Sequence, residues 1–172
     1  VYKRQRQSIR RDRQKGLYDN TQFGPGVASV DAVGVDGSMR PLVLLQPFAY
    51  LHMLIHSSRK FSDYLKRTLA QHNNRLSIIL YSDEINTGIP LASRQARNVQ
   101  SMYWSIAEFG RSALCRELLW MECIAARNDD VKTFRDGMAQ VLKLVMQQFL
   151  VAHDLRGGIV IYLAGGEAIL VG

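Results

Sequence analysis

The chain has 172 residues, of which 47% are hydrophobic, and this length fits one domain or one domain with an arm. The composition predicts a sizeable buried core and argues against a largely disordered chain. No apolar run approaches the roughly 18 residues of a membrane span. Only two cysteines are present, Cys115 and Cys123, which favours buried thiols in a reducing, intracellular compartment over a disulfide framework.

The positive charge is concentrated at the N-terminus. The net charge is +7, and residues 1–15 carry seven cations against one acid, so six of the seven net charges belong to this segment. The seven cations are Lys3, Arg4, Arg6, Arg10, Arg11, Arg13 and Lys15. We expect residues 1–15 to form a flexible arm that contacts the phosphates of DNA. A nuclear-import signal and a tail that only keeps the protein soluble are the alternatives.

The segment 16–46 has the composition of a linker. Its glycines and prolines fall at intervals typical of turns, namely Gly16, Gly24, Pro25, Gly26, Gly34, Gly37 and Pro41. We expect a linker here, with a short strand at Val30–Val35. The remaining residues, 47–172, are then expected to form the α/β domain.

Two helices are expected at the start of this domain. Pro47 suits the first position of a helix, and the apolar residues that follow recur at helical spacing as far as about Ser57. A second helix is predicted from about Lys60 to Gln71, with the apolar face Phe61, Tyr64, Leu65 and Leu69.

Strands are expected after the helices. Leu76–Tyr81 is short, apolar and rich in β-forming residues, which predicts a strand covered on both faces. Met102–Ile106 predicts a second strand, which ends at Gly110. Leu118–Ala125 fits either a helix or a third strand, and we favour the strand.

A long helix and a hairpin complete the expected order. Asn128–Asp130 offers side chains for an N-cap, and apolar residues from Val131 to Ala152 recur at helical spacing. Two strands, 159–163 and 168–171, are expected to form a hairpin. The predicted fold is therefore α/β (α+β): two helices, an antiparallel meander, a long helix and a hairpin. Because the last strand runs to the final residues, we expect the chain to be a fragment.

Asp83 is the first candidate for chemistry. It follows an apolar strand, where a carboxylate is costly unless a cation or a metal compensates it, and strand ends are common positions for sites in α/β proteins. The alternative is that Ser82–Glu84 forms a solvated turn. Glu84 is expected to point to the opposite side of the strand.

Two further residue pairs have both a structural and a functional interpretation. His52 and His56 share one face of a helix but lack the glutamate of a helical zinc motif, so we interpret them as a packing or surface pair. Tyr103 and Trp104 could stack on a nucleic-acid base, but two aromatic residues in a strand more often belong to the core.

A family resemblance rests on three segments of this sequence. Leu80–Glu84, Pro90–Ala92 and Met102–Ile106 resemble the start of the catalytic core of transposon-derived DDE transposases, especially the CACTA type and its uncharacterised relatives. The resemblance extends loosely over residues 47–172 and implies a partial RNase H-like core.

The resemblance implies a role for Asp83 as the first of three carboxylates that hold two divalent ions, Mg²⁺ or Mn²⁺. It implies that Asp83 lies beside the end of the strand 168–171, that the second carboxylate follows that strand, and that the third has no counterpart here. Glu84 stands where many relatives have glycine, and Asn86–Ile89 also departs from the pattern. The expected function is thus a fragment of a DNA-processing protein that is inactive alone. A non-catalytic nucleic-acid-binding or protein-interaction module, and a decayed mobile-element relic without activity, are the alternatives.

Overall fold

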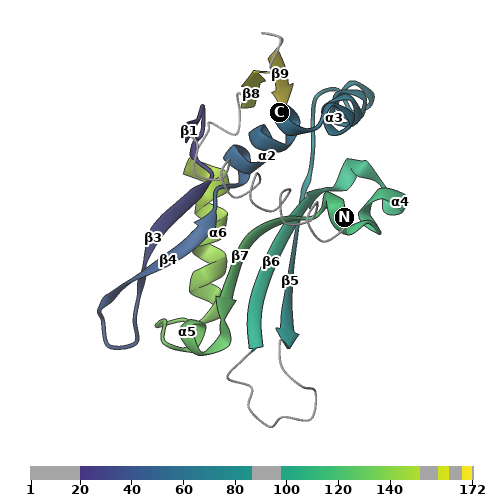
Figure 1. Ribbon diagram of the computed structural model, residues 1–172. Helices are drawn as coiled ribbons and strands as arrows, with labels where there is room; N and C mark the ends of the chain where they lie inside the picture. The colour runs from purple at the N-terminus through teal and green to yellow at the C-terminus, as the bar shows by residue number, and fades with distance from the viewer. Residues whose placement is uncertain (1–19, 87–97, 152–158, 163–167, 172) are drawn as a thin grey trace, which may run out of the picture.

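The computed structural model shows a mixed α/β protein, as the sequence predicts (Figure 1). It describes residues 20–86, 98–151, 159–162 and 168–171. Within these ranges every pair of strands is antiparallel. No helix among them is long and apolar enough to cross a membrane. The expected arm, 1–15, lies outside the described residues.

The predicted meander is confirmed. β5 (Ile78–Asn86), β6 (Asn98–Ile106) and β7 (Met121–Arg127) form one sheet in the order β5-β6-β7. The strand that we favoured at 118–125 is β7, shifted toward the C-terminus. The β6–β7 register shifts between Met102 and Tyr103, which marks a β-bulge.

Both predicted helices before the sheet are confirmed as α2 (Pro47–Ser57) and α3 (Arg59–Gln71). The Gln46 side chain accepts a hydrogen bond from the Ala49 backbone N–H at 2.6 Å, so an N-cap and a proline start α2 together. Ser58 caps α3 in the same way, through the backbone N–H of residue 61 at 3.3 Å.

The expected linker proves to be a β-hairpin. β3 (Val27–Val33) pairs with β4 (Met39–Leu45), preceded by the two-residue strands β1 (Asn20–Thr21) and β2 (Gly24–Pro25). Alternation along β4 buries Leu42 and Leu44 in the core, while Val43 between them faces outward. Gly37 lies between the two strands, whereas Pro41 lies within β4. The expectation of a linker was wrong, although most of the short strand expected at Val30–Val35 is part of β3.

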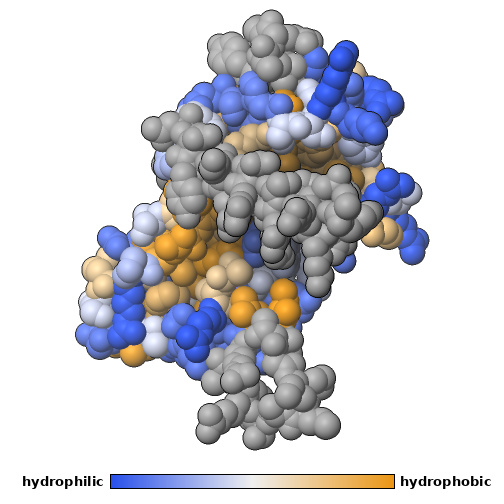
Figure 2. Space-filling model, in the orientation of Figure 1, coloured by the Kyte–Doolittle hydropathy of each residue, from blue (hydrophilic) through white to orange (hydrophobic). Residues whose placement is uncertain are grey.

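The hairpin also has an apolar outer surface. Val35, Met39 and Val43 are 64%, 60% and 59% exposed. Figure 2 shows hydrophobic side chains gathered on the side of the molecule that the hairpin occupies in Figure 1.

The expected long helix is divided in two. α5 (Asn128–Lys132) is separated from α6 (Met138–Val151) by a turn that ends at Gly137, whose φ is 53°. The cap position of α5 is Arg127, and its side chain makes no capping hydrogen bond, so the N-cap expected at Asn128–Asp130 was wrong.

Tertiary contacts explain this break. Phe134, in the turn, forms an isolated bridge with Gly34. The Val35 backbone N–H donates to the Thr133 carbonyl and the Arg135 N–H donates to the Val33 carbonyl, both at 2.9 Å. Residues after α5 therefore extend the β3 edge instead of continuing a helix.

The core lies on one face of the β5-β6-β7 sheet. The Trp104 ring meets the Phe149 ring of α6 edge-on at 5.4 Å, and Phe149 meets Phe48 of α2 at 5.8 Å. At the end of β6, the Tyr64 hydroxyl of α3 donates to the Phe109 carbonyl at 2.9 Å and the two rings stack. α2, α3 and α6 are thereby joined to the sheet through aromatic contacts.

The remaining elements are short. The 3₁₀ helix η2 (Ala107–Phe109) and the single turn α4 (Arg111–Leu114) follow β6, and a second 3₁₀ helix, η3 (Glu117–Leu119), precedes β7. The predicted hairpin is confirmed as β8 (Ile159–Tyr162) paired with β9 (Ala168–Val171).

Candidate functional site

The face of the β5-β6-β7 sheet that does not carry the core presents aromatic and acidic side chains. Tyr81 of β5 lies directly opposite Tyr103 of β6, and Asp83 lies opposite Ser101. Because opposite residues share a face and neighbours along a strand alternate, Tyr81, Asp83 and Tyr103 project away from buried Trp104.

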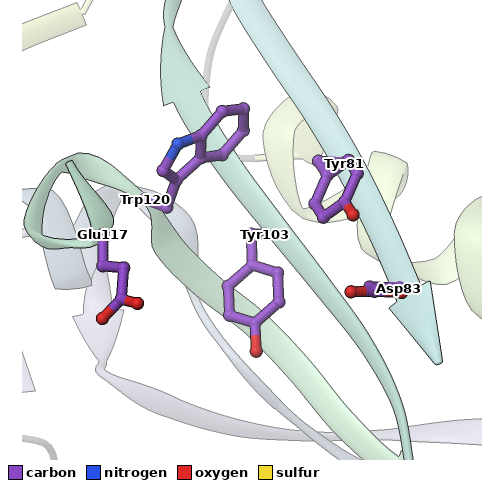
Figure 3. Close-up of a pocket in the computed structure, with 5 residues that line it drawn as sticks. All are labelled: Tyr81, Asp83, Tyr103, Glu117 and Trp120. Carbon is purple, nitrogen blue, oxygen red and sulfur yellow. The ribbon is translucent and has the colours of Figure 1, made fainter. Parts of the chain in front are cut away.

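These side chains line a cleft of about 560 Å³ (Figure 3). Tyr81, Asp83 and Tyr103 come from the sheet, whereas Glu117 comes from η3 and Trp120 from the residue before β7. In Figure 3 Tyr103 lies between the carboxylates of Glu117 and Asp83, with the indole of Trp120 at one end. The cleft therefore has aromatic walls and two acidic groups.

Hydrogen bonds hold the η3 side of the cleft in place. The Trp120 indole N–H donates to the Leu114 carbonyl at 2.8 Å. The buried Ser105 hydroxyl of β6 donates to the Leu119 carbonyl at 2.7 Å. The Tyr81 and Trp120 ring centroids lie 5.9 Å apart at an angle of 59°. The aromatic walls are thus set before any ligand arrives.

The cleft is acidic in a basic protein. The five residues that line it in the described part of the chain include two carboxylates, those of Asp83 and Glu117, and no Lys or Arg. Both acids are exposed. The negative faces of aromatic rings attract cations, and so do nearby carboxylates. The arrangement favours a positively charged group and disfavours a bare phosphate.

The structure places Asp83 differently from the sequence prediction in one respect. Asp83 lies inside β5, which continues to Asn86, and does not stand at the end of a buried strand. The expected cover on both faces of this strand was wrong, because Tyr81 and Ile85, which share a face, are 51% and 39% exposed. The Glu84 side chain projects from the opposite face of β5 to Asp83, as predicted, and accepts hydrogen bonds from the side chains of Asn98 and Asn128.

The neighbour that the resemblance implies for Asp83 is not there. β9 pairs with β8, and the two strands lie at the α2–α3 end of the molecule, away from the end of β5 that carries Asp83 (Figure 1). Throughout the described part of the chain, no three His, Cys, Asp or Glu residues group as metal ligands. The role of Asp83 as a metal ligand stays a prediction.

Two interpretations were given for the adjacent residues Tyr103 and Trp104, an exposed stacking surface and the core, and the structure places one residue in each setting. Trp104 is 1% exposed and belongs to the core, whereas Tyr103 lines the cleft.

The two cysteines also differ, because Cys115 is exposed and Cys123 is buried. Burial, with a smaller contribution from the Glu122 charge, raises the pKa of Cys123 to about 12. Buried thiols were expected for both, and the expectation was wrong for Cys115.

The histidine pair lies on α2, away from the cleft residues. The His52 and His56 rings are 4.2 Å apart, and Phe23 meets His52 edge-on at 6.1 Å. Partial burial, followed by the charge of His56, lowers the pKa of His52. These contacts agree with a packing pair.

Sequence reasoning missed Glu117 and Trp120. Glu117 lies just before the predicted strand Leu118–Ala125, and Trp120 lies near the start of that strand. Only the fold brings the two residues beside β5. The signal available was weak: a tryptophan immediately before a strand whose partner strand carries an aromatic pair. The seven cations proposed to bind nucleic acid lie in the arm, outside the described residues.

Comparisons of the chain with protein-family models, with curated proteins and with solved structures give no match. The fold and the cleft therefore carry the functional argument.

Proposed function

We propose that the protein is a non-catalytic binding module that holds a positively charged group of a partner in the cleft of Tyr81, Asp83, Tyr103, Glu117 and Trp120. One observation carries the proposal: three aromatic side chains and two carboxylates converge on one cleft, and none of its described lining residues is a cation. A cation on an aromatic face contributes about 0.5–1 kcal/mol at an exposed site and about 2 when desolvated.

The lining favours binding over catalysis. Among the described residues of the lining there is no thiol, imidazole or aliphatic hydroxyl, and the two carboxylates, which can act as nucleophile or base, have no such group beside them to activate or to relay a proton. Tyrosine and tryptophan supply rigid contact area at low entropic cost, which is typical of recognition surfaces. A lysine, an arginine or a quaternary ammonium group suits these walls.

A matched pair of small ligands tests the proposal. N-acetyl-trimethyllysine amide carries the cation, and its analogue with a tert-butyl group has the same shape without charge. We expect Trp120 fluorescence and NMR shifts to report binding of the cation alone, weakened several-fold by Tyr81→Ala and unaffected by Val43→Ala on the hairpin. Equal binding of the two ligands, or binding of neither, would overturn the proposal.

A fragment of a transposase-derived, DNA-processing protein is the second candidate. The order of elements favours it, because a meander, a helix and a hairpin follow one another as the resemblance implies. The test is nicking of supercoiled DNA with Mg²⁺ or Mn²⁺ by a longer version that supplies the two further carboxylates. Activity should vanish with Asp83→Asn and persist with Asp31→Asn, an exposed acid on β3.

DNA contact by the arm can be tested separately from the cleft. Deleting residues 1–15 should abolish DNA binding together with its salt dependence, since cations that neutralise phosphates release counterions. Tyr81→Ala should leave DNA binding unchanged. Salt-dependent binding that survives the deletion would contradict this role for the arm.

A further inference from the structure

Among the described strands, β5 presents an unpaired backbone edge. It is the outermost strand of the β5-β6-β7 sheet and pairs only with β6 among the described residues. Nine residues at about 3.4 Å each make an edge about 30 Å long. Alternate backbone N–H and C=O groups along this edge are therefore available to an added strand.

Among the described residues, the protection of this edge against pairing rests on its two acidic side chains. Proteins guard exposed strands with charged residues, proline, bulges or a covering element, and β5 contains no Pro, Gly, Lys or Arg. The bulge in the sheet lies between β6 and β7. Ile78, Tyr81 and Ile85 are 44%, 51% and 39% exposed, so apolar side chains flank the free backbone.

Charge selects the kind of strand that fits. The only charged residues of β5 are Asp83 and Glu84, which lie beside its centre at Ser82 and project to opposite faces. Antiparallel pairing of two copies about Ser82 would bring like charges to neighbouring positions, which is destabilising. A cationic strand meets opposite charge on both faces.

We propose that β5 pairs with an extended segment of a partner protein whose cationic side chains, at alternate positions, project over the cleft. Directly opposite residues in paired strands have Cβ atoms about 4.5–5.5 Å apart. A lysine or arginine opposite Asp83 then reaches its carboxylate, and one two positions away reaches the Tyr81 ring. The side-chain part rests on the proposed function, whereas the backbone pairing stands on the free edge.

Four labelled nine-residue peptides test this proposal against the full chain by fluorescence anisotropy. The parent alternates arginine with threonine, and a second peptide has the same composition with its arginines in one block. Two others carry N-methyl groups on the odd or on the even residues, which removes alternate backbone donors.

We expect the parent to bind at least about tenfold more tightly than the block peptide. One N-methylated peptide should lose at least tenfold in affinity while the other retains it, because only alternate residues face β5. Equal affinity of the parent and both N-methylated peptides would overturn the edge pairing. If the peptides show that result and the trimethyllysine ligand still binds specifically, the edge pairing fails while the proposed cation binding in the cleft stands. Failure of the edge pairing can therefore be distinguished from failure of the proposed function.

A charge-reversed variant supplies a matched control within the chain. Asp83→Lys should weaken the parent peptide at least tenfold, whereas Asp63→Lys, the same change at an exposed position of α3, should not. A dimer that forms through β5 and excludes the peptide would also contradict the proposal. Sedimentation of the chain with and without peptide checks this outcome.

Discussion

The two faces of the β5-β6-β7 sheet differ in burial, and two consecutive residues of β6 show the difference. Trp104 points into the core, 1% exposed, with the ring of Phe149 against it at 5.4 Å. Its neighbour Tyr103 points the other way and lines the cleft with Tyr81 and Trp120. Both faces are aromatic, but only one is covered by α2 and α6 among the described elements.

This difference separates stability from binding. Burial of a large aromatic side chain in a packed core contributes several kcal/mol. An aromatic side chain that remains partly in water contributes less to folding and keeps its area for a ligand. Substitutions on the two faces should therefore have opposite profiles, with loss of stability on one face and loss of affinity on the other.

The largest effect is expected from Trp104→Ala. Removing this fully buried ring should lower the free energy of unfolding by about 3–5 kcal/mol, measured by urea denaturation. Trp104→Phe is the control and should cost much less, because it keeps an aromatic ring and removes an indole N–H that has no hydrogen-bond partner in the core. A loss below about 1 kcal/mol for Trp104→Ala would contradict the assignment of this face as the core.

The two cysteines should show the next largest contrast. Cys115 is exposed, whereas the buried Cys123 has a pKa of about 12. Since the thiolate is the reactive form, we expect Cys123 to react with iodoacetamide at pH 8 at least about a hundredfold more slowly than Cys115. Mass spectrometry of the two tryptic peptides measures this ratio. Denaturant should abolish the difference, and equal rates in the folded protein would be incompatible with the burial of Cys123.

A smaller effect on folding is expected from Tyr103→Ala on the open face. The affinity for the trimethyllysine ligand should fall about five- to tenfold, which corresponds to roughly 1–1.4 kcal/mol. The free energy of unfolding should fall much less in the Tyr103→Ala variant than in the Trp104→Ala variant. Calorimetric titration and urea denaturation of the same variant give both values. A variant that keeps its affinity and loses as much stability as Trp104→Ala would remove the distinction between the faces.

The smallest effect on stability is expected from Asp83→Asn. The side chain is exposed on an edge strand, so the free energy of unfolding should change by no more than about 0.5 kcal/mol. The same change should weaken ligand binding and make it less sensitive to salt. Urea denaturation and salt titrations check the two parts, with Asp63→Asn on α3 as the control. A large loss of stability would show that Asp83 supports the fold.

Much of the element order could be predicted from local sequence. Helical spacing predicted α2 and α3, and short β-rich runs predicted β5, β6 and the β8–β9 hairpin. The turn at Thr133–Gly137 could not be predicted, because the apolar period runs through it from Val131 to Phe149. The break depends on the bridge from Phe134 to Gly34, which lies 100 residues earlier in the chain.

The hairpin and half of the cleft were hidden for related reasons. Glycine and proline between residues 24 and 41 indicated a linker, although the alternation of Leu42 and Leu44 with exposed residues was present in the sequence. Asp83 and Tyr103 could be singled out from their strands. Glu117 and Trp120 could not, since they reach β5 only through the path of the chain after β6.

The bridge between the β3–β4 hairpin and the turn after α5 has a consequence for synthesis of the protein. The Val33 carbonyl and the Val35 N–H can form their hydrogen bonds to Arg135 and Thr133 only after those residues, about 100 positions later in the chain, have left the ribosome. At roughly 5–20 residues per second this delay is on the order of 5–20 seconds. During that interval the apolar side of the hairpin, with Ala32, Leu42 and Leu44, has no α6 to cover it. A nascent chain at this stage is a natural client for a chaperone.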